Sequence, residues 1–95
     1  MTYSVEFRED AQKEWLRLDR LLQQQFAKKL KKCCENPHIP LAKLNGLKDC
    51  YKIKLRASGF RLVYQVFDDV LIIVVVAVGK RERNNVYNLA SARMK

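Results

Sequence analysis

Residues 51–64 read YKIKLRASGFRLVY, and this stretch predicts two neighbouring strands joined by a turn at Ala57–Gly59. Lys52, Lys54 and Arg56 alternate with apolar residues, which is the pattern of a β-strand with one buried face and one cationic face. Like charges on one face of a sheet repel one another, so folding alone does not explain their placement. The pattern therefore predicts a strand face that binds a polyanion.

The composition describes one small domain with a large basic surplus. The chain has 95 residues, of which 48% are hydrophobic, so it can bury a single core. It contains 19 Lys and Arg against 10 Asp and Glu, a formal net charge of +9. Residues 37–95 hold 11 of those bases and 4 of the acids, so +7 of the surplus lies there. Such an uneven surplus indicates a nucleic-acid partner first, an acidic protein second and a membrane surface third.

The cysteines and the start of the chain bear on the cellular compartment. Cys33 and Cys34 are adjacent, Cys50 stands apart and no C-x-x-C spacing occurs, so zinc and thioredoxin-like chemistry are not indicated. The first residues lack the charged start and apolar stretch of a secretory signal. The apolar run Val70–Val78 has nine residues, against the roughly 20 that a membrane helix requires. We expect a soluble, reduced, cytoplasmic protein with no membrane partner.

Two helices are predicted ahead of the main strands. After a weakly alternating strand at Tyr3–Phe7, the period becomes helical from Asp10. The apolar positions of the two helices are Ala11, Trp15 and Leu18, then Leu22, Phe26, Leu30 and Cys33. The second helix should end near Asn36-Pro37, because proline disfavours helical backbone in the residue before it.

Three strands and a short helix complete the predicted fold. The strands span about Asp49–Arg56, Phe60–Phe67 and Val70–Val78. The third is continuously apolar, so both of its faces should be covered and it should lie inside the sheet. Asp68-Asp69 supplies the turn before it, and Asn84 or Asn85 caps the last helix. The order β-α-α-β-β-β-α predicts one α+β domain over residues 1–95, with a mostly antiparallel four-stranded sheet, an N-terminal helical hairpin and a short C-terminal helix.

Some polar features have a simpler structural interpretation. The lysines among residues Lys28–Lys32 are most simply the solvated face of the second helix, with contact to RNA or the ribosome as the alternative. His38 is the only histidine and lies in a loop, so no second histidine completes an acid–base pair and a structural role is favoured. No pair of carboxylates is placed to bind a metal, which disfavours a two-metal nuclease.

Cationic and phenolic side chains form the candidate site. Lys52 and Lys54 project from one strand face about 7 Å apart, and Arg61 on the adjoining strand can join them. The basic residues that follow the central strand, and so emerge at one end of the sheet, are Lys80, Arg81 and Arg83. Tyr87, in the first turn of the last helix, is placed to stack on a base or donate a hydrogen bond. The supporting RNA-binding residues are Arg56, Lys80 and Arg83.

The chain resembles the RelE toxins of the RelE/ParE superfamily in residues 49–66 (DCYKIKLRASGFRLVYQV), 78–83 (VGKRER) and 86–87 (VY). The resemblance implies a ribosome-dependent endoribonuclease of a type II toxin–antitoxin system that cuts messenger RNA in the ribosomal A site and inhibits translation. It implies four partners: the 70S ribosome, mRNA, a neutralising RelB-like antitoxin, and operator DNA bound only through the repressing toxin–antitoxin complex. By the same resemblance the catalytic residues are Lys52, Lys54, Arg61, Arg81 and Tyr87.

Cleavage by this group requires neither a metal nor a cofactor, because RNA supplies its own nucleophile, the 2′-hydroxyl. The protein must align that oxygen, move protons and stabilise charge on the phosphate. Our hypothesis assigns the phosphate to Arg61 and Arg81, assistance and proton transfer to Lys52 and Lys54, and orientation or stacking of the nucleotide to Tyr87. Lysine is protonated at neutral pH, so the identity of the general base stays open.

Other functions remain in competition. A ParE-like toxin would poison DNA gyrase, but the chain retains the whole basic and phenolic group of the nucleases. A non-catalytic RNA-binding module is a second alternative, because Gly59–Tyr64 weakly resembles the aromatic strand of an RRM, although the order of elements differs. A repressor that binds DNA alone would need a recognition helix, and none is predicted. An RNA cleavage assay beside a gyrase supercoiling assay separates these possibilities.

Overall fold

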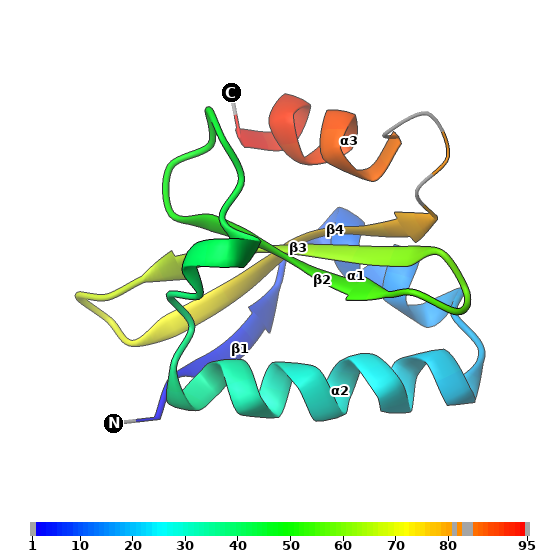
Figure 1. Cartoon of the computed structure of the whole chain (residues 1–95), viewed down its shortest axis with the longest axis horizontal. Helices are drawn as coiled ribbons and strands as arrows, with labels where there is room; N and C mark the ends of the chain where they lie inside the picture. Colours follow the sequence, from blue (N-terminus) through cyan, green and yellow to red (C-terminus); the bar gives the residue numbers. More distant parts are fainter. Residues whose placement is uncertain (1, 81, 83–84, 95) are drawn as a thin grey trace.

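The chain forms a four-stranded sheet with helices on both of its faces (Figure 1). The structure, a computed structural model, describes residues 2–80, 82 and 85–94. Its elements are β1 (Ser4–Phe7), α1 (Glu9–Leu16), α2 (Arg20–Glu35), the 3-10 helix η1 (Pro40–Ala42), β2 (Cys50–Leu55), β3 (Phe60–Phe67), β4 (Ile72–Lys80) and α3 (Asn85–Met94). This order confirms the predicted α+β arrangement.

The strands lie in the order β1-β4-β3-β2. β1 runs parallel to β4, whereas β3 is antiparallel to both β4 and β2. From β1 the chain passes through α1 and α2 to β2 at the opposite edge of the sheet, and β3 and β4 then return toward β1. The sheet is therefore mixed, and it is mostly antiparallel as predicted.

β4 lies between β1 and β3, as its continuous apolar run predicts. It begins at Ile72 rather than at the predicted Val70, because Val70 and Leu71 belong to the turn after β3. Leu71 has a φ of 56°, in the left-handed region that residues with branched side chains rarely adopt. The turn is thus longer than Asp68-Asp69, and its extra residues look like strand residues in the sequence.

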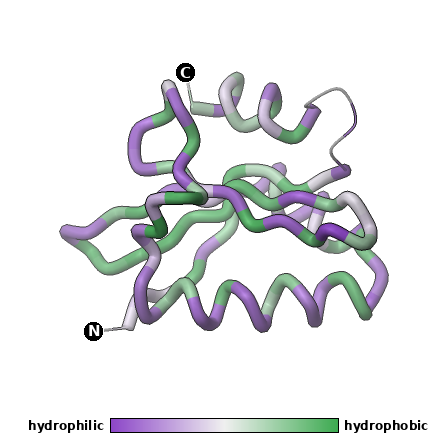
Figure 2. Tube along the Cα trace, in the orientation of Figure 1, coloured by the Kyte–Doolittle hydropathy of each residue, from purple (hydrophilic) through white to green (hydrophobic). Residues whose placement is uncertain are grey.

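The hairpin of α1 and α2 covers one face of the sheet, and along α2 hydrophobic and hydrophilic residues alternate (Figure 2). Its buried residues are Ala11, Leu18, Phe26, Leu30, Cys33 and Cys34. α2 follows Asp19, whose side chain accepts a hydrogen bond from the Leu22 amide at 2.9 Å and so caps the helix. The helix ends at Glu35, two residues before Pro37, which confirms the predicted boundary.

α3 covers the opposite face over a smaller apolar cluster (Figure 1). The buried residues of this cluster are Cys50, Val63, Val76, Ala77, Val86 and Ala90. Val76 forms a β-bulge, because Val75 pairs with Tyr64 while Ala77 pairs with the preceding residue, Val63. The bulge brings the successive residues Val76 and Ala77 into the same cluster, which provides the surface on which α3 packs.

Candidate functional site

Lys52, Lys54 and Arg61 lie on the face of the sheet that α3 covers. Residues two apart in a strand share a face, so the two lysines lie on the same side of β2 as Cys50 of the α3 cluster. Lys54 stands directly opposite Arg61 on β3, and Lys52 stands opposite Val63 of the same cluster. Lys54 is exposed and Lys52 is half-buried. The sheet therefore brings three of the candidate cations together.

Arg61 is buried, with 7% of its surface exposed. Its Nη1 donates a hydrogen bond to the Phe60 carbonyl oxygen at 3.0 Å and a longer one to the Leu55 carbonyl oxygen at 3.5 Å. Its Nε is buried and has no hydrogen-bond partner within the described ranges. Buried polar atoms in folded proteins nearly always have a partner. A buried charged donor without a partner is therefore unusual, and it marks Arg61 as a candidate functional residue.

Tyr87 approaches the same face from α3. Its side chain is half-buried and packs against the α3 cluster. The preceding residue, Val86, lies over Gly79, since a Cβ atom placed on Gly79 would be 3.9 Å from the Val86 Cβ. Gly79 is the β4 partner of Arg61. The first turn of α3 therefore stands over the strand position beside Arg61.

Lys80, another candidate cation, lies apart from Lys52, Lys54 and Arg61. Lys80 ends β4, but its strand partner is Phe60, and its Nζ lies 5.6 Å from the centre of the Phe60 ring. Phe60 packs against the core under α1 and α2, so Lys80 lies on the face opposite to Lys52 and Lys54. Arg81 and Arg83 fall outside the described residues.

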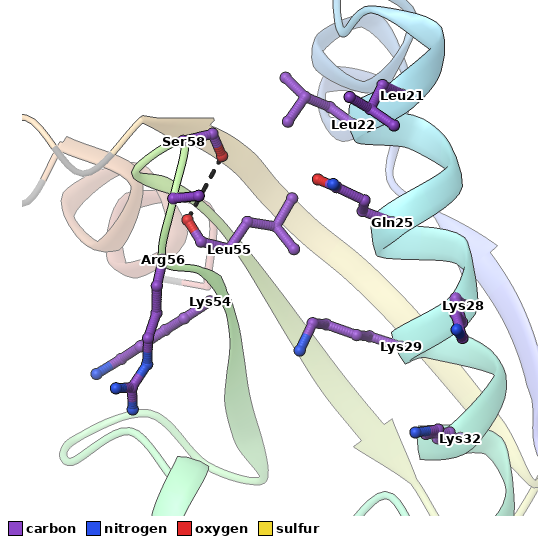
Figure 3. Close-up of a pocket in the computed structure, with 11 residues that line it drawn as sticks. Leu21, Leu22, Gln25, Lys28, Lys29, Lys32, Lys54, Leu55, Arg56 and Ser58 are labelled. Atoms are coloured by element: carbon purple, nitrogen blue, oxygen red, sulfur yellow. Dashed lines mark hydrogen bonds between the residues drawn. The ribbon is translucent and has the colours of Figure 1, made fainter.

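A basic groove of about 740 Å³ opens between α2 and the β2–β3 turn (Figure 3). Its cationic lining consists of Lys28, Lys29, Lys32, Lys54 and Arg56, and its other lining residues are Leu21, Leu22, Gln25, Leu55, Ala57 and Ser58. None of these described lining residues is acidic, so the groove concentrates positive potential. Lys54 both lines the groove and pairs with Arg61 in the sheet. The groove therefore adjoins the sheet face that carries Lys52, Lys54 and Arg61, which we call the basic face. The sequence pointed to its basic residues singly, through the lysines of α2 and through Lys54 and Arg56, but not to the groove that they form.

His38 takes part in a separate polar cluster near the other end of β3. Its Nδ1 lies 2.7 Å from the Tyr51 hydroxyl, and its Nε2 lies 2.7 Å from Asp68 Oδ1. The Tyr3 hydroxyl donates a hydrogen bond to the same Asp68 oxygen at 2.6 Å. Hydrogen bonds from Tyr3 and then from His38 lower the pKa of Asp68 below its ordinary value. His38 thus connects a loop, a strand and a turn, which favours the structural role expected for it.

Residues 2–80, 82 and 85–94 contain no group of three or more His, Cys, Asp or Glu side chains that could hold a metal ion. They also contain no helix that is both long and apolar enough to span a bilayer. All three cysteines are free and buried.

The fold matches that of a family of type II toxins. A family model described as "ParE toxin of type II toxin-antitoxin system, parDE" matches residues 5–85, and the chain belongs to this family. A RelE-like toxin protein of Escherichia coli is 78% identical over the full length of both chains. The mRNA interferase toxin RelE of Escherichia coli (strain K12) is 50% identical over 94 residues, 99% of each chain. These identities confirm the resemblance to RelE.

Solved structures agree with the sequence relatives. A mutant of the Escherichia coli toxin RelE in the free state superposes with a TM-score of 0.92 at 47% identity, covering 100% of both chains. A chain of the intact Escherichia coli RelBE toxin–antitoxin complex superposes with a TM-score of 0.82 at 51% identity, covering 85% of this chain and 99% of that one. The described fold is thus the RelE fold.

Proposed function

We propose that this chain is a ribosome-dependent endoribonuclease that cleaves messenger RNA in the ribosomal A site and is neutralised by a RelB-like antitoxin. The observation that carries the proposal is the gathering of Lys52, Lys54 and Arg61 on one face, with Tyr87 on the helix above it. A relative with 50% identity that is named an mRNA interferase supports the same activity. The 2′-hydroxyl of the message attacks the adjacent phosphorus, and the protein aligns the reacting atoms and stabilises charge.

Arg61 is the principal phosphate ligand in this mechanism. Its burial lowers the local dielectric and strengthens its attraction for the developing negative charge. Lys54, across the strand pair from Arg61, adds a second positive charge, and Lys52 adds a third. Arg81 is assigned to the same phosphate through its match to the RelE pattern, and Tyr87 orients or stacks on the nucleotide.

Dependence on the ribosome follows from the residues that are available. Lysine and tyrosine are both poor bases at neutral pH, so this group stabilises charge better than it removes a proton. If the substrate is already held with its 2′-hydroxyl in line with the leaving oxygen, the reaction depends less on a strong base. We therefore assign part of the rate acceleration to the geometry that the ribosome gives the message. Catalysis requires no metal ion.

The basic groove extends the RNA contact beyond the scissile phosphate. Its cations Lys28, Lys29 and Lys32 on α2 lie across from Lys54 and Arg56 (Figure 3). An RNA backbone that crosses the groove would meet positive charge on both walls. This assignment favours the RNA-contact alternative for the α2 lysines over a purely solvated surface. Lys80, which does not line the groove, and Arg83 remain further candidates for binding RNA.

The antitoxin is assigned by relationship and by charge. The RelBE complex of Escherichia coli contains a toxin chain with 51% identity to this one. A toxin with a formal charge of +9 and an uncovered basic groove suits an acidic antitoxin segment that competes with RNA. Binding to operator DNA, with repression of transcription, is assigned to the toxin–antitoxin complex and not to the toxin alone.

A paired assay tests the proposed reaction. Purified toxin is added to programmed ribosomes and, separately, to DNA gyrase, because the matching family model bears the ParE name. We expect cleavage of the message in the A-site codon, persistence of that cleavage in a chelator once ribosome integrity is verified, and unchanged gyrase supercoiling. Inhibition of gyrase without RNA cleavage would assign the chain to the gyrase poisons, and stable RNA binding without turnover would assign it to the binding modules.

A further inference from the structure

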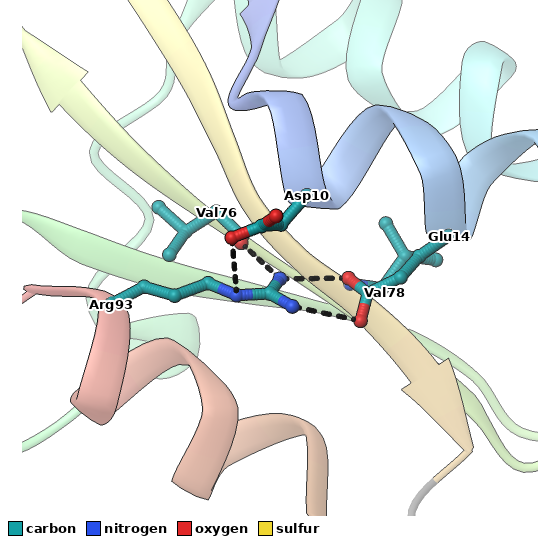
Figure 4. A network of polar contacts seen from close by, with 5 residues as sticks. All are labelled: Asp10, Glu14, Val76, Val78 and Arg93. Atoms are coloured by element: carbon teal, nitrogen blue, oxygen red, sulfur yellow. Dashed lines mark hydrogen bonds and ion pairs between the residues drawn. The ribbon is translucent and has the colours of Figure 1, made fainter.

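Arg93 and Glu14 form a two-pronged ion pair that joins α3 to α1 (Figure 4). Arg93 Nη1 donates a hydrogen bond to Glu14 Oε1 at 2.8 Å, and Nη2 donates one to Oε2 at 3.1 Å. The two side chains are largely buried, at 15% and 19% exposure. Planar, paired hydrogen bonds shielded from water distinguish this contact from an ordinary surface salt bridge.

The same two side chains also form hydrogen bonds with backbone groups of β4 that no neighbouring strand reaches on that edge. The Val76 carbonyl oxygen accepts a hydrogen bond from Arg93 Nη1 at 2.9 Å, and the Val78 amide donates one to Glu14 Oε1 at 3.1 Å. β1 pairs with β4 only over Ile72–Val75, so it does not reach these backbone groups. The bulge at Val76 changes the direction in which the strand presents its backbone groups. Three separate elements, α1, β4 and α3, therefore meet at Arg93.

Apart from this ion pair, α3 is held by apolar contacts, which include those of Leu89 and Met94 with the α3 cluster. It is ten residues long, and an isolated helix of that length is marginal in water. Its buried residues are Val86, near the start, and Ala90, in the middle. Arg93 lies in the last turn, about 9 Å along the helix axis from Tyr87. The ion pair with Glu14, joined by a longer one between Arg93 Nε and Asp10 Oδ2 at 3.8 Å, is thus a polar attachment at the far end of the helix whose first turn carries Tyr87.

We propose that Arg93 is a positioning residue for RNA cleavage, which holds α3 through Glu14 and the Val76 carbonyl so that Tyr87 stays over the basic face. This inference rests on the proposed function. The Arg93 guanidinium is directed at Glu14 and at the edge of β4, and it acts on the reaction only through the orientation of α3 (Figure 4). A displacement of about 1 Å at a reacting group can reduce a rate by about 100-fold.

A double-mutant cycle with Tyr87 tests this role. Single-turnover cleavage is measured at saturating programmed ribosomes for Arg93→Met, Arg93→Lys and the exposed control Arg20→Met, in the parent and in Tyr87→Ala. In the parent, Arg93→Met should reduce the rate roughly 10- to 100-fold, Arg93→Lys less, and Arg20→Met not at all. In the Tyr87→Ala background, Arg93→Met should reduce the cleavage rate by no more than about 2-fold further, because the side chain that Arg93 positions is already absent.

Amide hydrogen exchange supplies a readout that does not depend on RNA cleavage. Arg93→Met should accelerate exchange in α3 while protection of β3 and α2 is kept. If Arg93→Met does not fold, Arg93→Lys is judged by the same criteria, because it keeps the charge and loses the paired geometry. An unchanged cleavage rate, or the same loss in both backgrounds, would overturn the inference. Failure of the wild-type toxin to cleave RNA would instead refute the proposed function, and the exchange data would still decide whether Arg93 holds α3.

Discussion

Lys54 on β2 lies directly opposite Arg61 on β3, so two positive residues occupy facing positions in the sheet. Like charges in this arrangement destabilise a sheet by a few tenths of a kcal/mol to about 1 kcal/mol. A phosphate bound between the two strands would be attracted by both cations. The relationship therefore favours a role in binding an anion.

Replacement of Lys54 should separate activity from stability. Lys54→Gln removes one charge from an exposed side chain, so the free energy of unfolding should stay within about 0.5 kcal/mol of the wild-type value. The single-turnover cleavage rate should fall by about 10-fold or more, because a charge that stabilises the transition state is lost. Urea unfolding and cleavage on programmed ribosomes measure the two quantities. Equal activity in Lys54→Gln and in the control Lys13→Gln would remove Lys54 from the active site.

The groove lysines should contribute to ribosome affinity and to its salt dependence. The double variant Lys28→Gln/Lys32→Gln should weaken ribosome binding and reduce the slope of log affinity against log salt by about 1.5, since two phosphate contacts are lost. The cleavage rate at saturating ribosomes should change little. Lys31→Gln, an exposed residue of α2 outside the groove lining, is the matched control. A slope that is the same in the double variant and the wild type would mean that these lysines do not contact phosphate.

The cluster around Asp68 should make stability depend on pH in the acid range. Because hydrogen bonds from Tyr3 and His38 lower the pKa of Asp68 in the folded state, its contribution is present above the ordinary carboxyl pKa of about 4. The contribution is lost as the pH falls through the lowered pKa. Asp68→Asn should therefore reduce the free energy of unfolding at neutral pH, and its curve should approach that of the wild type in acid. Urea titrations across this range test the prediction, with the exposed neighbour in Asp69→Asn as control. A difference that is constant with pH would rule out the ionised Asp68 as its source.

The buried cysteines should react slowly while the protein is folded. Burial, and then the nearby charge of Asp49, raise the pKa of Cys50 to about 11. At pH 8 only about one Cys50 thiol in a thousand is then ionised, and the thiolate is the reactive form. Iodoacetamide labelling of Cys50, followed by mass spectrometry, should be at least about 100-fold slower in the native protein than in urea. Equal labelling rates in the two states would show that the native structure does not protect the thiol.

Elements with regular periodicity were predictable from the sequence. The alternation around Lys52 and Lys54 identified β2 and its cationic face, because a strand has a strict two-residue repeat. Pro37 marked the end of α2 for a steric reason that acts locally. β4 was identified as an interior strand by its apolar run, but its start was placed two residues early. Val70 and Leu71 are apolar, and nothing in their composition reveals the left-handed backbone at Leu71.

Contacts between distant segments were not predictable. Arg93 and Glu14 are 79 positions apart, and neither belongs to a motif that would indicate the other. The basic groove likewise forms only when α2 packs beside the β2–β3 turn, so Leu21 and Ser58 gave no sign of a shared site. The position of Lys80 depends on the register between β3 and β4. Because Lys80 pairs with Phe60, its side chain lies on the face of the sheet away from Lys54. Such placements depend on how the chain folds in three dimensions.

The most direct measurement compares cleavage of one message free in solution and on the ribosome by the same purified toxin. Primer extension locates the cuts for the wild type and for Tyr87→Phe. Our account predicts cuts confined to the codon in the A site, a rate on naked message lower by about 1000-fold or more, and a slower rate on the ribosome without the phenolic hydroxyl. Equal rates on naked and ribosome-bound message would contradict the claim that the ribosome supplies the reactive geometry to this basic face.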